Sequence, residues 1–125
     1  MKINKTWHIY TDLEIGSTAG LFKCVQLDQY SYVIKFRFVR NRRAISQSED
    51  LSGKIFLHFY LPNGEQIVEL VDIEYDSGIF PIPNSFLTVA GTASLQVEER
   101  DALNNVINNP NSLEFEIKIS PWEVS

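Results

Sequence analysis

The turn sequence Pro62-Asn63-Gly64, set between two apolar runs, constrains the fold of this chain more than any other feature. Pro62 favours the φ angle of the second turn position, Asn63 suits the third, and Gly64 accepts the left-handed conformation in which the chain turns back. The flanking segments 54–61 and 65–75 alternate apolar and polar residues, which is the period of a half-buried strand. Together they predict a β-hairpin.

The same period of two recurs elsewhere in the chain. In segment 31–39 it predicts one buried face, made of Tyr32, Ile34, Phe36 and Phe38. In segment 113–119 it predicts another, made of Leu113, Phe115, Ile117 and Ile119. Further strands are expected at 6–11, 20–27, 78–82 and 92–99. The strand at 78–82 is expected at a sheet edge, because its proline cannot donate a hydrogen bond to a neighbour.

Helical signal is limited to short turns at 83–91 and 99–110. A length of 125 residues fits a single domain, which we expect to span 1–125. Short strands with turn signals about every ten residues are typical of a β-sandwich. The sequence therefore predicts an all-β fold: a small antiparallel β-sandwich of seven to eight strands with one or two short helical turns.

Cysteine content and hydropathy exclude several classes of protein. The single cysteine, Cys24, cannot form an internal disulfide and is expected to be a small buried residue. The chain contains no apolar run of about 18 residues, and its first ten residues lack the apolar core of a signal peptide. We therefore expect synthesis in a cytosol-like compartment and no contact with a membrane.

Charge is divided unevenly along the chain. Residues 1–43 carry a net charge of +5 and residues 44–125 a net charge of −10, for a total of −5. The acidic total argues against nucleic acid as a partner. The division has two interpretations: an electrostatically directed contact with a partner or another copy, or two halves that interleave in the fold and mix their charges.

The residues that could support catalysis do not converge. His8 and His58 each stand among apolar neighbours, so a surface or hydrogen-bonded histidine is expected rather than a metal ligand. Asp72, Glu74 and Asp76 have the spacing of calcium ligands but lack the glycine and distal glutamate of an EF-hand. We expect a protein that is not an enzyme, with no metal site and no cofactor.

Two groups of residues are candidates for a protein interface. The densest charged feature is a run of four arginines: Arg37, Arg40, Arg42 and Arg43. Their forked guanidinium groups suit carboxylates, so the polar loop that follows is a candidate docking loop, and an ordinary solvated loop is the alternative. Trp7 and Trp122 are candidate interface anchors, with core packing as the alternative.

A series of short motifs follows one another in a fixed order between residues 32 and 120. They are Leu51-Ser52-Gly53, Pro62-Asn63-Gly64, Gly78-Ile79-Phe80, an apolar turn from Leu87 to Gly91, and a last strand with Phe115, Ile117 and Ile119. In this order and spacing the chain resembles the amino-terminal domain of the upper baseplate proteins of siphophages, lactococcal phages especially.

The resemblance implies a structural role in the tail-tip baseplate of a virion made in the host cytoplasm. In such proteins the amino-terminal domain docks on a hub around the distal tail protein. A trimerising portion and a carboxy-terminal part then carry the receptor-binding proteins. The implied partners are thus other baseplate proteins and further copies of the chain as a trimer. Here we expect either the anchoring domain of a longer chain or a short stand-alone relative, with no catalytic residue to carry over.

A carbohydrate-binding β-sandwich is the alternative function. Phe56, Tyr60 and Trp7 would then be the rings that stack on sugars. The two interpretations differ in where these rings point, because rings buried against a second sheet leave no stacking platform. A hydrolase on a β scaffold is a third class, for which no set of acid, base and nucleophile can be assembled.

Overall fold

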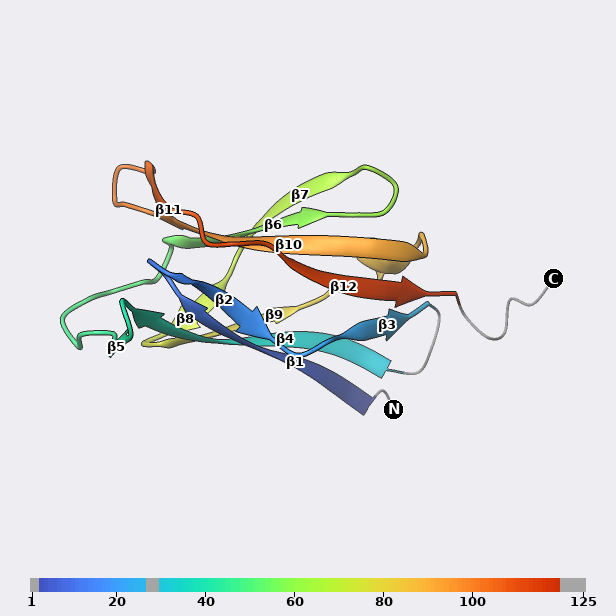
Figure 1. Ribbon diagram of the computed structural model, residues 1–125, viewed down its shortest axis with the longest axis horizontal. Helices are drawn as coiled ribbons and strands as arrows, with labels where there is room; N and C mark the ends of the chain where they lie inside the picture. Colours follow the sequence, from blue (N-terminus) through green and yellow to red (C-terminus); the bar gives the residue numbers. More distant parts are fainter. Residues whose placement is uncertain (1–2, 27–29, 120–125) are drawn as a thin grey trace.

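The computed structural model describes residues 3–26 and 30–119, which form two β-sheets packed face to face (Figure 1). Sheet A contains β1 (Ile3–Asp12), β2 (Gly16–Ala19), β4 (Tyr30–Arg40), β5 (Arg43–Ala44), β8 (Asp72–Glu74) and β9 (Ser77–Pro81). Sheet B contains β3 (Lys23–Val25), β6 (Ile55–Tyr60), β7 (Gln66–Leu70), β10 (Gly91–Arg100), β11 (Val106–Asn108) and β12 (Leu113–Lys118). A 3₁₀ turn, η1 (Asn84–Leu87), connects β9 to β10. The prediction of an all-β sandwich is confirmed.

Both sheets are mixed, which corrects the prediction of an antiparallel sandwich. β1 runs parallel to β4 along its whole length, and β12 runs parallel to β3. Apolar residues alternate in the same way in parallel and antiparallel strands, so the sequence pattern could not separate the two arrangements. A parallel pair needs a long crossover connection, and the chain between β1 and β4 supplies one that contains β2 and β3.

The described residues form twelve strand segments rather than the seven to eight predicted. The segments that no predicted strand covers are short: β2, β5 and β11 have four, two and three residues. Alternation over so few residues carries little signal. β11 also replaces the helical turn expected at 99–110, whereas η1 lies within the expected turn at 83–91.

The predicted hairpin is present as β6 and β7. The two strands pair from Phe56↔Leu70 to Tyr60↔Gln66, and the Gly64 N–H donates to the Leu61 carbonyl across the turn at 2.9 Å. The predicted return strand then divides, because the chain leaves sheet B after β7 and joins sheet A as β8. Buried Val71 lies at this crossing between the sheets.

Strand β9 is not the edge strand that its proline predicts. It lies between β4 and β8, but β8 pairs only as far as Ile79, so Pro81 has a neighbour on one side alone. The Ile82 N–H donates to the Tyr32 carbonyl at 2.8 Å, which leaves the backbone of Pro81 facing away from β4. The missing N–H of Pro81 therefore interrupts no hydrogen bond of the ladder.

The core lies between the sheets and is rich in aromatic rings. Phe59 of sheet B contacts Phe80 of sheet A and Phe86 of η1, with ring centroids 5.3 Å and 5.1 Å apart. All the residues of the face predicted for segment 31–39 are buried, as is the free thiol Cys24. In the last strand Phe115 and Ile117 are buried, but Ile119 is 65% exposed beyond the end of β12, which corrects its assignment to the core.

Replacing Gly64 with valine should lower the free energy of unfolding by about 1 kcal/mol or more, because Gly64 has a φ of +87° at which a branched side chain is strained. No atom lies within 4 Å of the Cβ that the change would add, so the loss would come from the backbone and not from a clash. Gly20 is equally open and carries no such left-handed φ, so Gly20→Val is the matched control and should change stability by less than about 0.5 kcal/mol. Denaturant unfolding measures both variants, and equal losses would contradict the turn assignment.

Candidate docking surface

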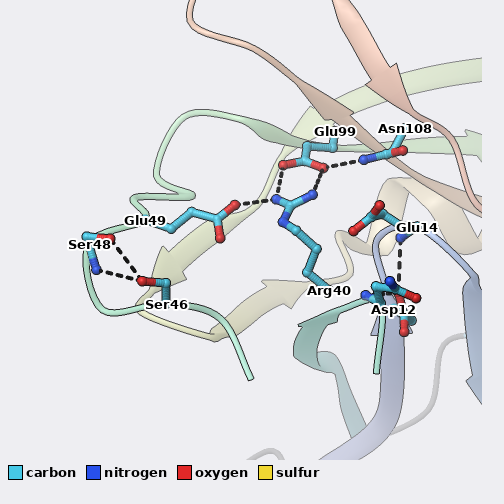
Figure 2. Close-up of polar contacts among 9 residues, drawn as sticks. Asp12, Glu14, Arg40, Ser46, Ser48, Glu49, Glu99 and Asn108 are labelled. Atoms are coloured by element: carbon cyan, nitrogen blue, oxygen red, sulfur yellow. Dashed lines mark hydrogen bonds and ion pairs between the residues drawn. The ribbon is translucent and has the colours of Figure 1, made fainter. Parts of the chain in front are cut away.

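One end of the sandwich is closed by an ion pair that joins the two sheets. Arg40 ends β4 in sheet A, and its Nη1 and Nη2 donate to the two carboxylate oxygens of Glu99 in sheet B, at 3.0 Å and 2.6 Å. Figure 2 shows the guanidinium of Arg40 between Glu99 and Glu49, which also accepts from Nη2. The Asn108 amide donates to Glu99 from β11 at 2.8 Å. Glu99 is 3% exposed, so this is a largely buried and hydrogen-bonded charge.

The electrostatics of this junction keep Arg40 charged. Its hydrogen bonds to Glu99 are the largest influence and raise the pKa of Arg40 above its already high usual value, against the opposing effect of burial. Arg40 is therefore cationic wherever the protein is folded. A buried carboxylate that lost this partner would be left with an uncompensated charge, which is strongly destabilising.

Asp12, at the end of β1, fixes two neighbouring loops through backbone N–H groups. Its carboxylate accepts from Glu14 and Ile15 in its own turn, at 3.1 Å and 3.2 Å. It also accepts from Asn41 and Arg42 in the turn between β4 and β5, at 2.9 Å and 2.7 Å. The side chain is 5% exposed, so these donors replace the water that it gives up on folding.

The turn that Asp12 holds has an unusual backbone. Asn41 and Arg42 have φ values of 49° and 65°, and the flanking residues Arg40 and Arg43 pair with each other. Two left-handed residues in a two-residue hairpin loop are the signature of a type I′ turn, which asparagine tolerates better than arginine. The hydrogen bonds that Asn41 and Arg42 donate to Asp12 compensate for this strain and set the direction in which the turn projects.

The four arginines of the predicted interface have different environments. Arg40 is the internal partner described above, and Arg37 pairs with Asp76 at 3.0 Å while its side chain stays 65% exposed. Arg42 and Arg43 are exposed, and their side chains form no hydrogen bond or ion pair with another described residue. The structure thus separates one half-buried, internally paired arginine from two that are free to contact a partner. Whether they do so stays a prediction.

The two tryptophans of the predicted interface are not placed on a described surface. Trp7 lies in the core, 3% exposed, where its ring stacks on Phe22 and its Nε1–H donates to the Gly20 carbonyl at 2.9 Å. An interface role for Trp7 would need the core to open. Trp122 falls outside the described residues.

Ion pairs between the two halves of the chain neutralise part of its uneven charge. Arg40 and Arg37 belong to the basic segment 1–43, and their partners Glu99, Glu49 and Asp76 belong to the acidic remainder. This agrees with the interleaving of the two halves. Arg42 and Arg43 are left as unpaired positive charge at one end of the sandwich.

Asp12 and Glu99 were not identified as key residues from the sequence, although one signal was present. In β10 the buried residues Ala93, Leu95 and Val97 alternate, and the same period of two places Glu99 on the inner face. In β4 it places Arg40 after Phe38 on the opposing inner face. Opposite charges at the ends of two inner faces predict a cross-sheet ion pair. The role of Asp12 depends on loops distant in sequence and had no such signal.

The rings predicted to bind sugars do not form one platform. Phe56 lies beneath the guanidinium of Arg100, whose Cζ is 4.0 Å from the ring centroid, and Trp7 is in the core. Tyr60 is 37% exposed. Beside them, His58 Nε2 lies 2.7 Å from a carboxylate oxygen of Glu98 but is not aligned with it for a hydrogen bond.

A different aromatic side chain lies in a hollow on the outer face of sheet A. Two adjoining hollows of about 330 Å³ and 290 Å³ share Lys35 and Ser77 in their lining. Tyr10 lines the second hollow and is 48% exposed, and the strand register places Thr18 and Arg37 on either side of it. Tyr10 was not predicted as a site residue, because alternation with Trp7 and Ile9 places it on the outer face but gives no sign of a hollow there.

The described part of the chain contains neither a candidate metal site nor a candidate membrane-spanning helix. Among residues 3–26 and 30–119, no group of three histidine, cysteine, aspartate or glutamate side chains lies close enough together to hold a metal ion. Among the described elements, no helix is long and apolar enough to cross a membrane.

Comparison with known proteins is informative at the level of structure. No protein-family model matches the chain, and no curated protein matches its sequence. The N-terminal domain of phage TP901-1 ORF48 is similar in structure, with a TM-score of 0.52 over 94% of this chain and 98% of that one, at 14% sequence identity. This chain shares the fold of that phage domain. At the level of the fold, the resemblance suggested by the sequence is confirmed.

Replacing Asp12 with asparagine should lower the free energy of unfolding at pH 7 by about 1 to 3 kcal/mol, because an amide oxygen cannot accept from all four donors and its NH₂ would face N–H groups. Burial alone would raise the pKa of Asp12, but the four backbone donors together outweigh it and lower the pKa. The stabilisation is therefore complete above the unfolded pKa of about 3.9 and is lost as the pH falls through the folded pKa.

Unfolding measured from pH 7 to pH 2.5 checks this prediction. The difference between wild type and Asp12→Asn should shrink below about pH 4. Glu14→Gln is the control, since Glu14 is exposed and contributes only its backbone N–H to the turn. A difference that stays constant with pH would contradict the role given to the ionised carboxylate.

Proposed function

We propose that this domain is a non-enzymatic structural module of a phage tail baseplate, which docks the carrier of a receptor-binding protein onto the central tail hub. The observation that supports it most is the fold shared with the N-terminal domain of a phage protein over nearly the whole of both chains. The motifs that resemble upper baseplate proteins support the same role. The site of action would be the tail-tip baseplate of the virion.

The loop of Arg42 and Arg43 is the best candidate for the docking contact. Its base is fixed by Asp12 and by the Arg40–Glu99 pair, so little conformational entropy is left to lose on binding. Each free guanidinium can bind a carboxylate through two hydrogen bonds, and a cationic pair also speeds the encounter with an acidic surface. The acidic partner would be the hub or a neighbouring copy in a trimeric assembly.

Changing both Arg42 and Arg43 to serine should weaken the complex with purified tail-hub proteins by roughly tenfold or more and reduce the dependence of its affinity on salt. The thermal transition should stay nearly unchanged, because neither side chain has an internal partner among the described residues. Arg40 is left intact in this variant, since its loss would expose Glu99 as an unpaired charge. Calorimetry or sedimentation at two salt concentrations measures the effect.

The control removes the same charge elsewhere, by changing Lys23 and Lys118 on neighbouring strands β3 and β12 to serine. It should bind the hub like the wild type. No complex between the wild type and any tail-hub protein would contradict the proposed function, and an equal loss of affinity in both variants would remove the loop from the docking contact.

The hollow at Tyr10 supports carbohydrate binding as a second candidate function. An exposed aromatic ring with a hydroxyl and an amino group beside it, from Thr18 and Lys35, has the chemistry that recognises a sugar ring. Tyr10→Ala should then abolish binding to host cell-wall saccharide in a glycan pull-down, whereas Tyr60→Ala, on the other sheet, should not. Wild-type protein that binds no saccharide would refute this second function.

A further inference from the structure

Strand β7 presents an open edge of sheet B. The order of the sheet is β3-β12-β10-β6-β7, so β7 has β6 on one side and no described strand on the other. Two hydrogen bonds flank the paired residues of β6 and β7. The Leu61 N–H donates to the Glu65 carbonyl at 2.9 Å, and the Val71 N–H donates to the Ile55 carbonyl at 3.0 Å. They fix which residues of β7 bond to β6, because bonded and non-bonded pairs alternate along an antiparallel ladder.

Counting inward from these flanking bonds, Ile67 and Glu69 direct their backbone groups toward β6. The N–H and C=O groups of Gln66, Val68 and Leu70 therefore point outward from the sheet. Their side chains lie on its outer face, where Val68 is 48% exposed and Leu70 is 50% exposed. A row of free donors and acceptors is thus combined with an apolar surface.

This edge is less protected than the other edges of the two sheets. The other strands at the ends of the two sheets, β2, β8 and β3, have only three or four residues. β7 pairs over five residues and contains no lysine, arginine or proline, so the only charge that protects this edge is Glu69 on its inner face.

We propose that β7 pairs with β7 of a second copy, antiparallel and about a two-fold axis through Val68, which joins two copies of sheet B into one continuous sheet. In this register Val68 exchanges both backbone hydrogen bonds with Val68 of the second copy. Gln66 does the same with Leu70 of the second copy, and Leu70 with Gln66. All the outward groups of the strand are then used.

The side chains favour a second copy over an unrelated strand, because the sequence QIVEL is complementary to itself in this register. On the outer face the two Val68 side chains meet at the axis, and each Leu70 lies opposite a Gln66. On the inner face each Glu69 lies opposite an Ile67, so no two like charges face each other directly. The surface is small, so pairing is weak in solution and strengthens where copies are held close together in an assembly.

Cysteine cross-linking tests the register. At a hydrogen-bonded pair the Cα atoms lie about 5.5 Å apart, within the range that a disulfide spans, so Val68→Cys should form a covalent dimer under mild oxidation. Gln66 lies two residues from the axis, which separates the two Gln66 Cα atoms by about 14 Å, so Gln66→Cys alone should stay monomeric. A mixture of Gln66→Cys and Leu70→Cys should cross-link. The native Cys24 is buried and does not interfere.

A second measurement keeps the test independent of disulfide chemistry. Sedimentation of the wild type over a concentration series should show reversible dimers, and Val68→Lys should weaken them several-fold because two lysines would meet at the axis. Val106→Lys, on the exposed strand β11, is the control and should leave the dimers unchanged.

A monomeric Val68→Cys protein would overturn the proposal, and so would equal cross-linking of Gln66→Cys. Dimers that persist in Val68→Lys would place the contact elsewhere and overturn it too. These experiments use this chain alone, so their outcome is separate from the binding of tail-hub proteins.

Discussion

The ion pair between Arg40 and Glu99 is the interaction on which the functional end of this sandwich depends. Apolar side chains fill the space between the two sheets along most of their length, but at this end the two inner faces finish in opposite charges. Burial of a single carboxylate here would be costly, and a bidentate guanidinium together with the Asn108 amide removes most of that cost. The pair thereby joins β4 to β10 and also fixes the point where β4 turns into the arginine loop.

The same junction separates residues that hold the fold from residues that are free to bind. Asp12 holds the backbone of a turn with two left-handed residues, and Arg40 anchors the strand before it, so the strained part of the loop is supported from two sides. The side chains of Arg42 and Arg43 project from this rigid base. A docking contact built in this way loses little entropy when it forms, because its backbone is already ordered. The two hollows of sheet A and the open edge of β7 lie on other parts of the surface, which leaves room for more than one partner in an assembly.

Much of the fold could be predicted from the sequence, because burial in a sandwich follows a period of two. That period identified the inner faces of β4 and β6, and the chemistry of Pro62, Asn63 and Gly64 identified the hairpin. It could not distinguish parallel from antiparallel neighbours, detect strands of two to four residues, or show that Ile119 lies beyond the last pairing. Of the candidate interface residues, Trp7 proved to be core and Arg40 an internal partner, since the sequence gives a residue type and a face but not the side chain that lies opposite. The role of Asp12 depends on contacts across 30 residues of sequence and could not be foreseen.

A double-mutant cycle on Arg40 and Glu99 tests the central claim most directly. The free energies of unfolding of Arg40→Met, Glu99→Leu and the double variant would be compared with that of the wild type. If the pair holds the two sheets together, each single variant leaves the other charge unpaired. The two single losses of unfolding free energy then sum to more than the loss in the double variant, by a coupling free energy of about 1 to 3 kcal/mol. Single losses that add up to the loss of the double variant, with no coupling, would show that the two residues act independently and would contradict the account.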